Sequence, residues 1–159
     1  MKRILMALAG AFALVALAVA PAYAQSGHFV TGGGNAAECV DIGTQLRCTG
    51  KVAGLGGTTF EITVQAQGVA SVECTNPAGN VAPGQDTTIT ATASSGPLPT
   101  PRNGQFVFNL ATETPTVPNV PTCPNPQWTA TVVDVTFGDA TLSLFENGAL
   151  SDQIVVPVG

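Results

Sequence analysis

The sequence predicts an all-β fold, an antiparallel β-sandwich of immunoglobulin-like type that is stabilised by disulfides. Residues 59–67, TFEITVQAQ, alternate strictly between apolar and polar side chains, which is typical of a strand with one buried face. No stretch after residue 24 keeps a helical period over a dozen residues, and its frequent Gly, Pro and Thr disfavour helix. A closed β-barrel, which also buries one face of every strand, is the second choice.

The N-terminal segment has the three parts of a secretory signal peptide. Lys2 and Arg3 precede an apolar run over residues 4–20, and a small-residue Ala-Tyr-Ala site ends at Ala24. A membrane anchor is the alternative, but the apolar run is short for a full span and the cleavage site follows directly. We therefore expect a signal peptide over 1–24, one secreted β-sandwich domain over 25–159, and no membrane insertion of the mature chain.

The mature chain is acidic. It keeps three basic residues, Arg47, Lys51 and Arg102, against ten acidic ones, which gives a formal net charge of −7. Nucleic acid and anionic membrane surfaces need cationic contacts, so both are excluded as partners. An extracellular protein or a glycan is the expected partner, and we expect a monomer.

Further strands follow in chain order. Residues 87–94, TTITATAS, and residues 104–110, GQFVFNL, alternate like the first strand. Strands are also predicted over residues 28–31, 45–53, 69–74, 128–137, 141–146 and 153–156. Eight or nine short strands in one domain bury their apolar faces most simply in two packed sheets.

Two dipeptides predict turns near the C-terminus. Asn147-Gly148 suits the positive φ angles of a type I′ turn, and Gly138-Asp139 also lies between two predicted strands. Together they predict a three-stranded meander. Val132 and Val133 break the alternation, which predicts a β-bulge or a change of side there.

Two segments are predicted loops, residues 94–103 and residues 112–125. The second has a proline at about every third position, which favours extended, polyproline-like backbone. Such a segment is either a stiff connection between strands or a docking loop, because long ordered loops often carry binding.

Four cysteines in an exported chain predict two disulfides. Cys74 and Cys123 are each followed by an Asn-Pro pair, CTNP and CPNP, which ends strand pairing and favours a turn. If the sheets bring these boundaries together, Cys74 pairs with Cys123 and Cys39 pairs with Cys48 across a hairpin. The pairing of Cys39 with Cys74 and of Cys48 with Cys123 stays open. A zinc site is disfavoured because no C-x-x-C spacing occurs.

The runs VECTNPAGN, NGQFVFNL and CPNPQWTATVVDVTFGDATLSLFENG give the chain a family resemblance. The chain resembles a group of small exported proteins of actinobacteria that carry CTNP and CPNPxWTA motifs and a final β-meander. The resemblance covers roughly the latter two-thirds of the mature chain. It implies export and a β-rich domain, and it implies no activity.

Catalytic chemistry is disfavoured by the residues at hand, and no metal or cofactor is expected. His28 is the only histidine and lies near the mature N-terminus, where a general base is poorly supported. The acids that could hydrolyse a glycoside, Asp134, Asp139, Glu146 and Asp152, scatter over strands and turns. No calcium-binding loop of the D-x-D-x-D-G kind occurs.

These observations predict a secreted binding or structural module without catalytic activity. One alternative is an inhibitor of a secreted hydrolase that presents residues 112–126 as a tethered loop. The other is a small carbohydrate-active enzyme. Trp128 is expected as a core anchor beside a disulfide. The candidate binding residues are Asn76, Pro118, Asn119, Asn125 and Trp128.

Overall fold

A computed structural model describes residues 26–159, so the predicted signal peptide over residues 1–24 lies outside the described residues. The described chain is almost entirely strand, with one 3-10 turn, η1 (Gly33–Asn35), and one short helix, α1 (Asn119–Thr122). The strands are β1 (His28–Phe29), β2 (Glu38–Asp41), β3 (Leu46–Ala53), β4 (Thr59–Thr75), β5 (Val81–Pro83), β6 (Thr87–Ser94), β7 (Leu98–Pro99), β8 (Phe106–Ala111), β9 (Thr129–Glu146) and β10 (Ala149–Val156).

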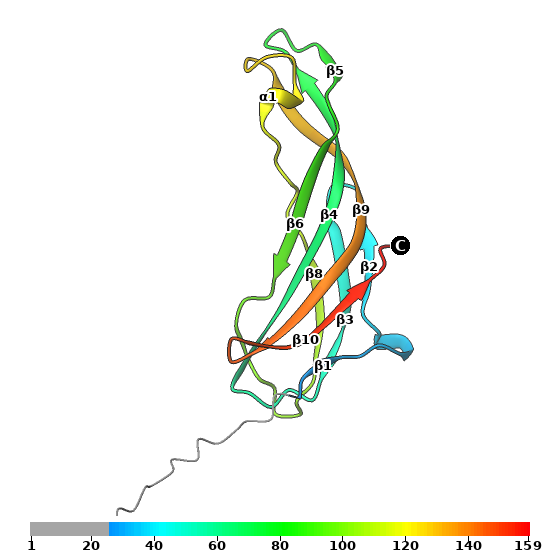
Figure 1. Cartoon of the computed structure of the whole chain (residues 1–159), viewed down its shortest axis with the longest axis vertical. Coiled ribbons are helices and arrows are strands. Elements are labelled where there is room, and N and C mark those ends of the chain that lie inside the picture. The colour runs from blue at the N-terminus through cyan, green and yellow to red at the C-terminus, as the bar shows by residue number, and fades with distance from the viewer. Residues whose placement is uncertain (1–25) are drawn as a thin grey trace, which may run out of the picture.

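The strands form two packed antiparallel sheets, as Figure 1 shows. In the smaller sheet, β3 is central, with β1 and β2 along one edge and β8 along the other. In the larger sheet, β10, β9 and β4 lie in that order, and β5, β6 and β7 pair in turn along the far edge of β4. The predicted β-sandwich is therefore confirmed, and the closed barrel offered as second choice is wrong.

The core lies between the two sheets. Every second residue of β4 points inward, and Phe60, Ile62 and Val64 are almost completely buried. Aromatic rings join the layers, because Phe60 of the larger sheet packs on Phe106 of the smaller one with centroids 5.1 Å apart. The period-two pattern of the sequence thus becomes one continuous apolar layer.

The long strand β4 corrects the prediction of separate strands over 59–67 and 69–74. Gly68 does not interrupt it, because the even-numbered residues are buried both before and after this glycine. A Cβ on Gly68 would lie 2.8 Å from Cγ1 of Val135 and 2.9 Å from the carbonyl oxygen of Thr136. Glycine is required there for close approach to β9 rather than for a turn.

The predicted three-stranded meander is also wrong, because β9 runs unbroken through Gly138 and Asp139. Neither residue has a positive φ, and both face the single residue Gln67 of β4 as a β-bulge. The predicted Asn147-Gly148 turn is confirmed, with φ angles of 50° and 80°. The predicted irregularity near Val132 and Val133 is confirmed as well, because the register with β4 shifts there.

The sandwich is closed along one side and open along the other. At the closed side, Cys39 of β2 and Val158 form a parallel bridge, and Gly159 N–H donates to the carbonyl of Cys39. At the open side, β6 and β8 are the outermost strands of their sheets. Among residues 26–159, no helix has the length and apolarity that a membrane span needs.

Candidate binding site

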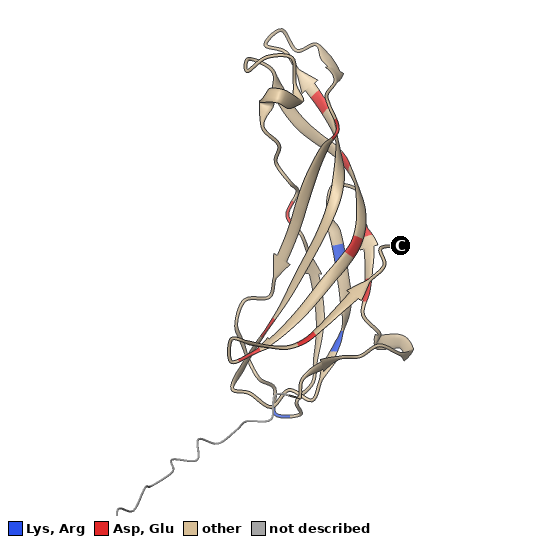
Figure 2. Cartoon of the chain, viewed as in Figure 1, with Lys and Arg blue, Asp and Glu red and all other residues tan. Residues whose placement is uncertain are grey.

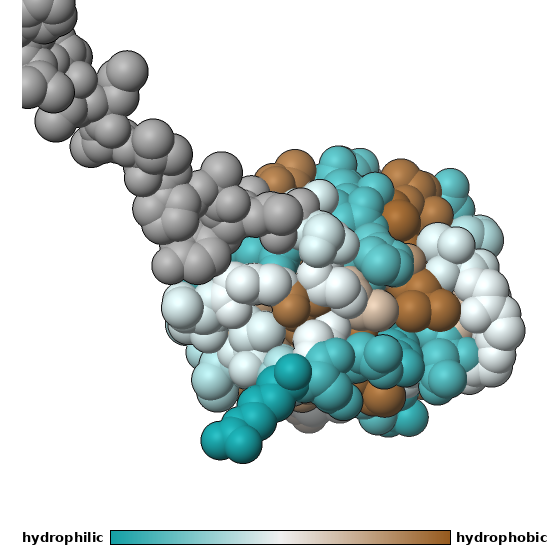
Figure 3. Space-filling model, turned by 90° about the horizontal axis from the view of Figure 1, so that it is seen from below, coloured by the Kyte–Doolittle hydropathy of each residue, from teal (hydrophilic) through white to brown (hydrophobic). Residues whose placement is uncertain are grey.

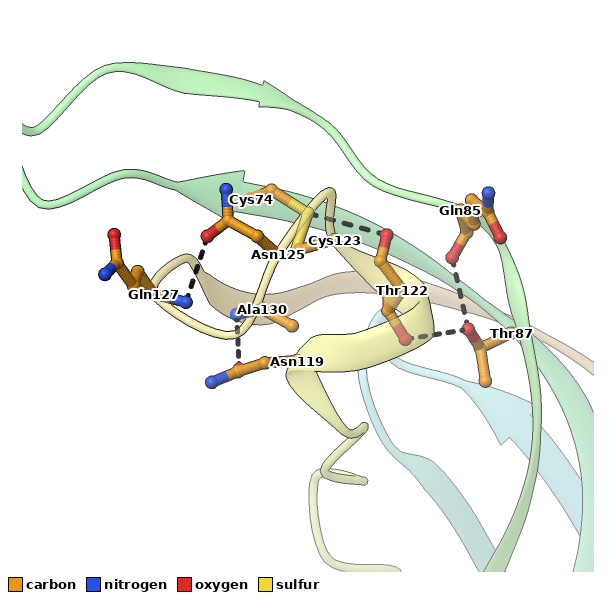
Figure 4. Close-up of a disulfide and its surroundings, with 9 residues drawn as sticks. All are labelled: Cys74, Gln85, Thr87, Asn119, Thr122, Cys123, Asn125, Gln127 and Ala130. Atoms are coloured by element: carbon orange, nitrogen blue, oxygen red, sulfur yellow. Dashed lines mark hydrogen bonds between the residues drawn. A yellow bond between two sulfur atoms is a disulfide. The ribbon is translucent and has the colours of Figure 1, made fainter.

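Both predicted disulfides are confirmed. Cys39 and Cys48 are direct partners in the hairpin of β2 and β3, with Cα atoms 4.1 Å apart. Cys74 and Cys123 are 49 residues apart in sequence and 5.7 Å apart between Cα atoms. The second disulfide ties the end of β4 to the proline-rich segment that follows β8 (Figure 4).

All five predicted binding residues lie around this second disulfide, at one end of the molecule. Thr75 and Thr129 are the last register pair of β4 and β9 at this end, and Asn76 directly follows Thr75 while Trp128 directly precedes Thr129. Asn119 reaches the same place, because its Oδ1 accepts a hydrogen bond from Ala130 N–H at 3.0 Å. We call residues 76–81 and 119–128, joined by the Cys74–Cys123 disulfide, the tip.

Two asparagine side chains, those of Asn76 and Asn125, shape the backbone of the tip. Oδ1 of Asn76 accepts hydrogen bonds from the N–H groups of Ala78 and Asn80, each at 2.9 Å. Oδ1 of Asn125 accepts one from Gln127 N–H at 3.0 Å. These are the Asx-turns that the Asn-Pro pairs predict. With the bond from Ala130 to Asn119, the side-chain oxygens of Asn76, Asn119 and Asn125 are occupied, and they hold the backbone of the tip in place.

Further hydrogen bonds fix residues 119–128, the second segment of the tip. Thr122 is buried, and its carbonyl accepts a hydrogen bond from Gln85 N–H at 2.9 Å. Cys123 N–H donates to the carbonyl of Asn119 at 2.6 Å. Residues 119–122, part of the predicted extended loop, thereby form the short turn α1, preceded by the exposed Pro118.

Trp128 corrects the expectation of a core anchor. It is half-buried and lies outside the apolar core. At this end β4 and β9 extend beyond the strands of the smaller sheet, as Figure 1 shows. The indole is therefore part of the tip.

The tip is uncharged and partly apolar. No charged residue occurs from 74 to 85 or from 114 to 133, and the tip is tan throughout in Figure 2. Its exposed apolar side chains include Val81 and Val120, which are 58% and 49% exposed. Figure 3 views the opposite end, where hydrophobic residues are interspersed with hydrophilic ones.

That opposite end contains a buried carboxylate, Glu146. Its Oε1 accepts hydrogen bonds from Gly56 and Gly57 N–H, and its Oε2 accepts them from Gly27 N–H and the Ser151 hydroxyl. Burial by itself would raise the pKa of the Glu146 carboxyl, but these bonds to the charged form outweigh it and lower the pKa below its ordinary value. The carboxylate joins separate loops to the end of β9.

The other acids proposed for glycoside hydrolysis are dispersed. Oδ2 of Asp152 accepts a hydrogen bond from Phe29 N–H at 2.8 Å, which ties β1 to β10. Asp134 and Asp139 are exposed on β9. Within the described residues, no group of three or more His, Cys, Asp or Glu side chains is placed to hold a metal ion.

Sequence reasoning missed a groove beside the tip. It has a volume of about 920 Å³ and lies between β6 and the segment over residues 113–118. Pro118 belongs to the lining, so the groove begins where the tip ends. The spacing of prolines in residues 112–125 was the only signal of it, because extended backbone cannot collapse onto β6 as a helix would.

Comparison of the chain with protein-family models, curated proteins and solved structures found no match.

Proposed function

We propose that the chain is a secreted binding module without catalytic activity, and that its tip binds an extracellular protein. The observation that carries the proposal is the combination of an uncharged, partly apolar surface with a backbone pinned by a disulfide. The resemblance to exported actinobacterial proteins supports export, as do the disulfides, which persist in oxidising compartments. The immunoglobulin-like identity of the sandwich stays part of this proposal.

Two physical effects favour binding at the tip. Exposed apolar side chains without neighbouring charges lose little solvation when a partner covers them. A pinned loop also loses little conformational entropy on binding, which leaves more of the contact energy as affinity. Trp128 adds an aromatic side chain of the kind enriched in protein interfaces.

The test immobilises the chain and identifies the proteins that it retains from the culture medium of the source cells. Val120→Asp places a charge in the tip, whereas Val155→Asp makes the same change at an exposed valine of β10, 64% exposed, outside it. We expect the unchanged chain and Val155→Asp to retain the same partner and Val120→Asp to lose it. Equal retention by all three chains would contradict the proposal.

Inhibition of a secreted hydrolase through residues 112–126 is a second candidate. It is favoured by the exposed run from Pro118 to Pro121, which the Cys74–Cys123 disulfide ties to the end of β4. Protein inhibitors bind through loops that are ordered before binding. The check is inhibition of hydrolases in the same culture medium by the unchanged chain and not by Val120→Asp. A carbohydrate-active enzyme has less support, because Glu146 and Asp152 already accept backbone hydrogen bonds.

A further inference from the structure

β6 has a hydrogen-bonding edge that no strand of residues 26–159 covers. It pairs with β4 alone, in unbroken register from Thr87 to Ser94. Ser95 N–H donates to the carbonyl of Ile62 at 2.9 Å, so the odd-numbered residues of β6 are the ones whose backbone groups face β4. Because hydrogen-bonded pairs alternate along antiparallel strands, the free backbone groups belong to Thr88, Thr90 and Thr92.

Proteins usually protect such an edge with charge, proline or a bulge. The opposite edge of this sheet follows that rule, because β10 carries Asp152 and a register shift beside it. β5 and β7 each contain a proline. β6, TTITATAS, has eight residues without a charge, a proline or a register shift. Its composition favours pairing with another strand rather than preventing it.

The free edge faces the groove described above. All of β6 lines this groove on one side, and Glu113 to Pro118 line it on the other. A strand added to β6 would lie in the groove and exchange backbone hydrogen bonds with Thr88, Thr90 and Thr92. The length of β6 matches an added strand of about six to eight residues.

We propose that β6 binds an extended peptide segment of a partner protein as an added antiparallel strand, with a basic side chain facing Glu113. The negative charge of the groove favours this ligand over a second copy of the chain. Glu113 is the one charged residue of the lining, and the chain after residue 24 carries a formal net charge of −7. A second copy of the chain would bring the same negative charge to the groove, whereas a basic peptide is attracted to it.

The test selects peptides of about nine random residues, displayed on phage, against the full chain expressed for export so that both disulfides form. Enriched peptides should be rich in β-branched residues and carry Lys or Arg. The strongest peptide is then resynthesised together with two copies that are N-methylated on alternate residues. One copy is methylated at the odd-numbered positions and the other at the even-numbered positions. We expect one phase of methylation to abolish binding and the other to leave it nearly unchanged, because one side of an added strand faces β6.

Two matched proline variants test the edge itself. Thr90→Pro removes a free N–H of β6, and proline is tolerated on edge strands when its nitrogen faces outward. Val107→Pro makes the same change on β8, the other open edge. Thr112 N–H donates to the carbonyl of Leu46 on β3, so the even-numbered residues of β8 face β3 and the N–H of Val107 points outward. We expect Thr90→Pro to bind the peptide about tenfold more weakly and Val107→Pro to bind it normally. Glu113→Lys leaves the backbone intact and should reverse the preference for basic peptides.

Several results would overturn the proposal. They are the absence of enriched peptides, equal binding of both methylated copies, unchanged binding by Thr90→Pro and by Glu113→Lys, or self-association that Thr90→Pro abolishes. The last result would assign the edge to a second copy. The proposal is independent of the tip, because Val120→Asp should leave peptide binding unchanged, so the two proposals fail separately.

Discussion

At the scale of single residues, Glu146 joins parts of the chain that are far apart in sequence. One carboxylate accepts hydrogen bonds from Gly27, from Gly56 and Gly57, and from Ser151. Because the side chain is fully buried, water cannot replace any of these partners. Sequence reasoning placed Glu146 at the end of a predicted strand and could not foresee its burial, because three of these four donors are backbone N–H groups of glycines, which carry no side-chain signal.

Glu146→Gln tests this network. The amide keeps one accepting oxygen but directs a donor at Gly27 N–H, which is left without an acceptor. We expect the free energy of unfolding at pH 7 to fall by about 2–3 kcal/mol, measured by chemical denaturation. Glu73→Gln, an exposed change on β4, is the control and should stay within about 0.5 kcal/mol of the unchanged chain.

The same carboxylate predicts a pH dependence. The pKa of Glu146 is lowered on folding from an ordinary value of 4.5, so the folded state binds fewer protons than the unfolded state in that range. The stabilisation by Glu146 is present above pH 4.5 and is lost as the pH falls through the lower folded pKa. The difference in unfolding free energy between the unchanged chain and Glu146→Gln should therefore shrink below this pH. A difference that stays constant under acid conditions would exclude this role.

At the scale of elements, alternation predicted the inward faces well and predicted strand ends poorly. Phe60, Ile62 and Val64 were assigned to the core, and they are buried there. Gly68 and Gly138 were interpreted as strand breaks, although both lie inside long strands. A glycine in a strand marks either a turn or a close approach, and only the partner strand decides between them.

Gly68 and Gly138 provide a matched pair of variants. Gly68→Ala brings a methyl group against the rigid carbonyl of Thr136, so we expect a loss of about 1–3 kcal/mol of unfolding free energy. Gly138→Ala meets its nearest neighbour, the carbonyl of Gln67, at an ordinary 3.6 Å and should change stability by less than about 0.5 kcal/mol. Thermal or chemical unfolding measures both. Equal losses would refute the assignment of Gly68 to a close approach.

At the scale of the whole molecule, the two disulfides have unequal tasks. The Cys74–Cys123 bond closes a loop of 49 residues and the Cys39–Cys48 bond one of 9. In the chain-entropy description, these closures stabilise the fold by about 4 and about 2.5 kcal/mol. Replacing Cys74 and Cys123 together by alanine should therefore cost more stability than replacing Cys39 and Cys48.

A second readout separates the two disulfide variants. Trp128 is the only tryptophan of the chain and belongs to the tip, so its fluorescence reports order at that end. Loss of the Cys74–Cys123 bond should shift the emission toward that of exposed indole in the folded protein. Loss of the Cys39–Cys48 bond should leave the emission unchanged. The reverse pattern of stabilities or emission would contradict the division of roles.

The β-sandwich followed from the sequence because it depends on a local pattern, the alternation of apolar and polar residues. The sequence favoured the observed disulfide pairing but left a second pairing open, and the structure decides between them. The assembly of the candidate site could not be predicted from the sequence. Asn76 and Asn125 were named for their turns, yet the position of Trp128 outside the core depends on β4 and β9 extending past the smaller sheet. The open edge of β6 likewise depends on which strands pair, and pairing is a property of the whole chain.

The most direct measurement is photocrosslinking from the tip in cultures of the source cells. A photoreactive phenylalanine derivative replaces Val120 in one chain and Val155, on β10 outside the tip, in another. The account predicts an adduct with an extracellular protein from position 120 and none from position 155. Adducts from position 155 alone, or equal yields from both positions, would contradict the assignment of the tip as the binding face.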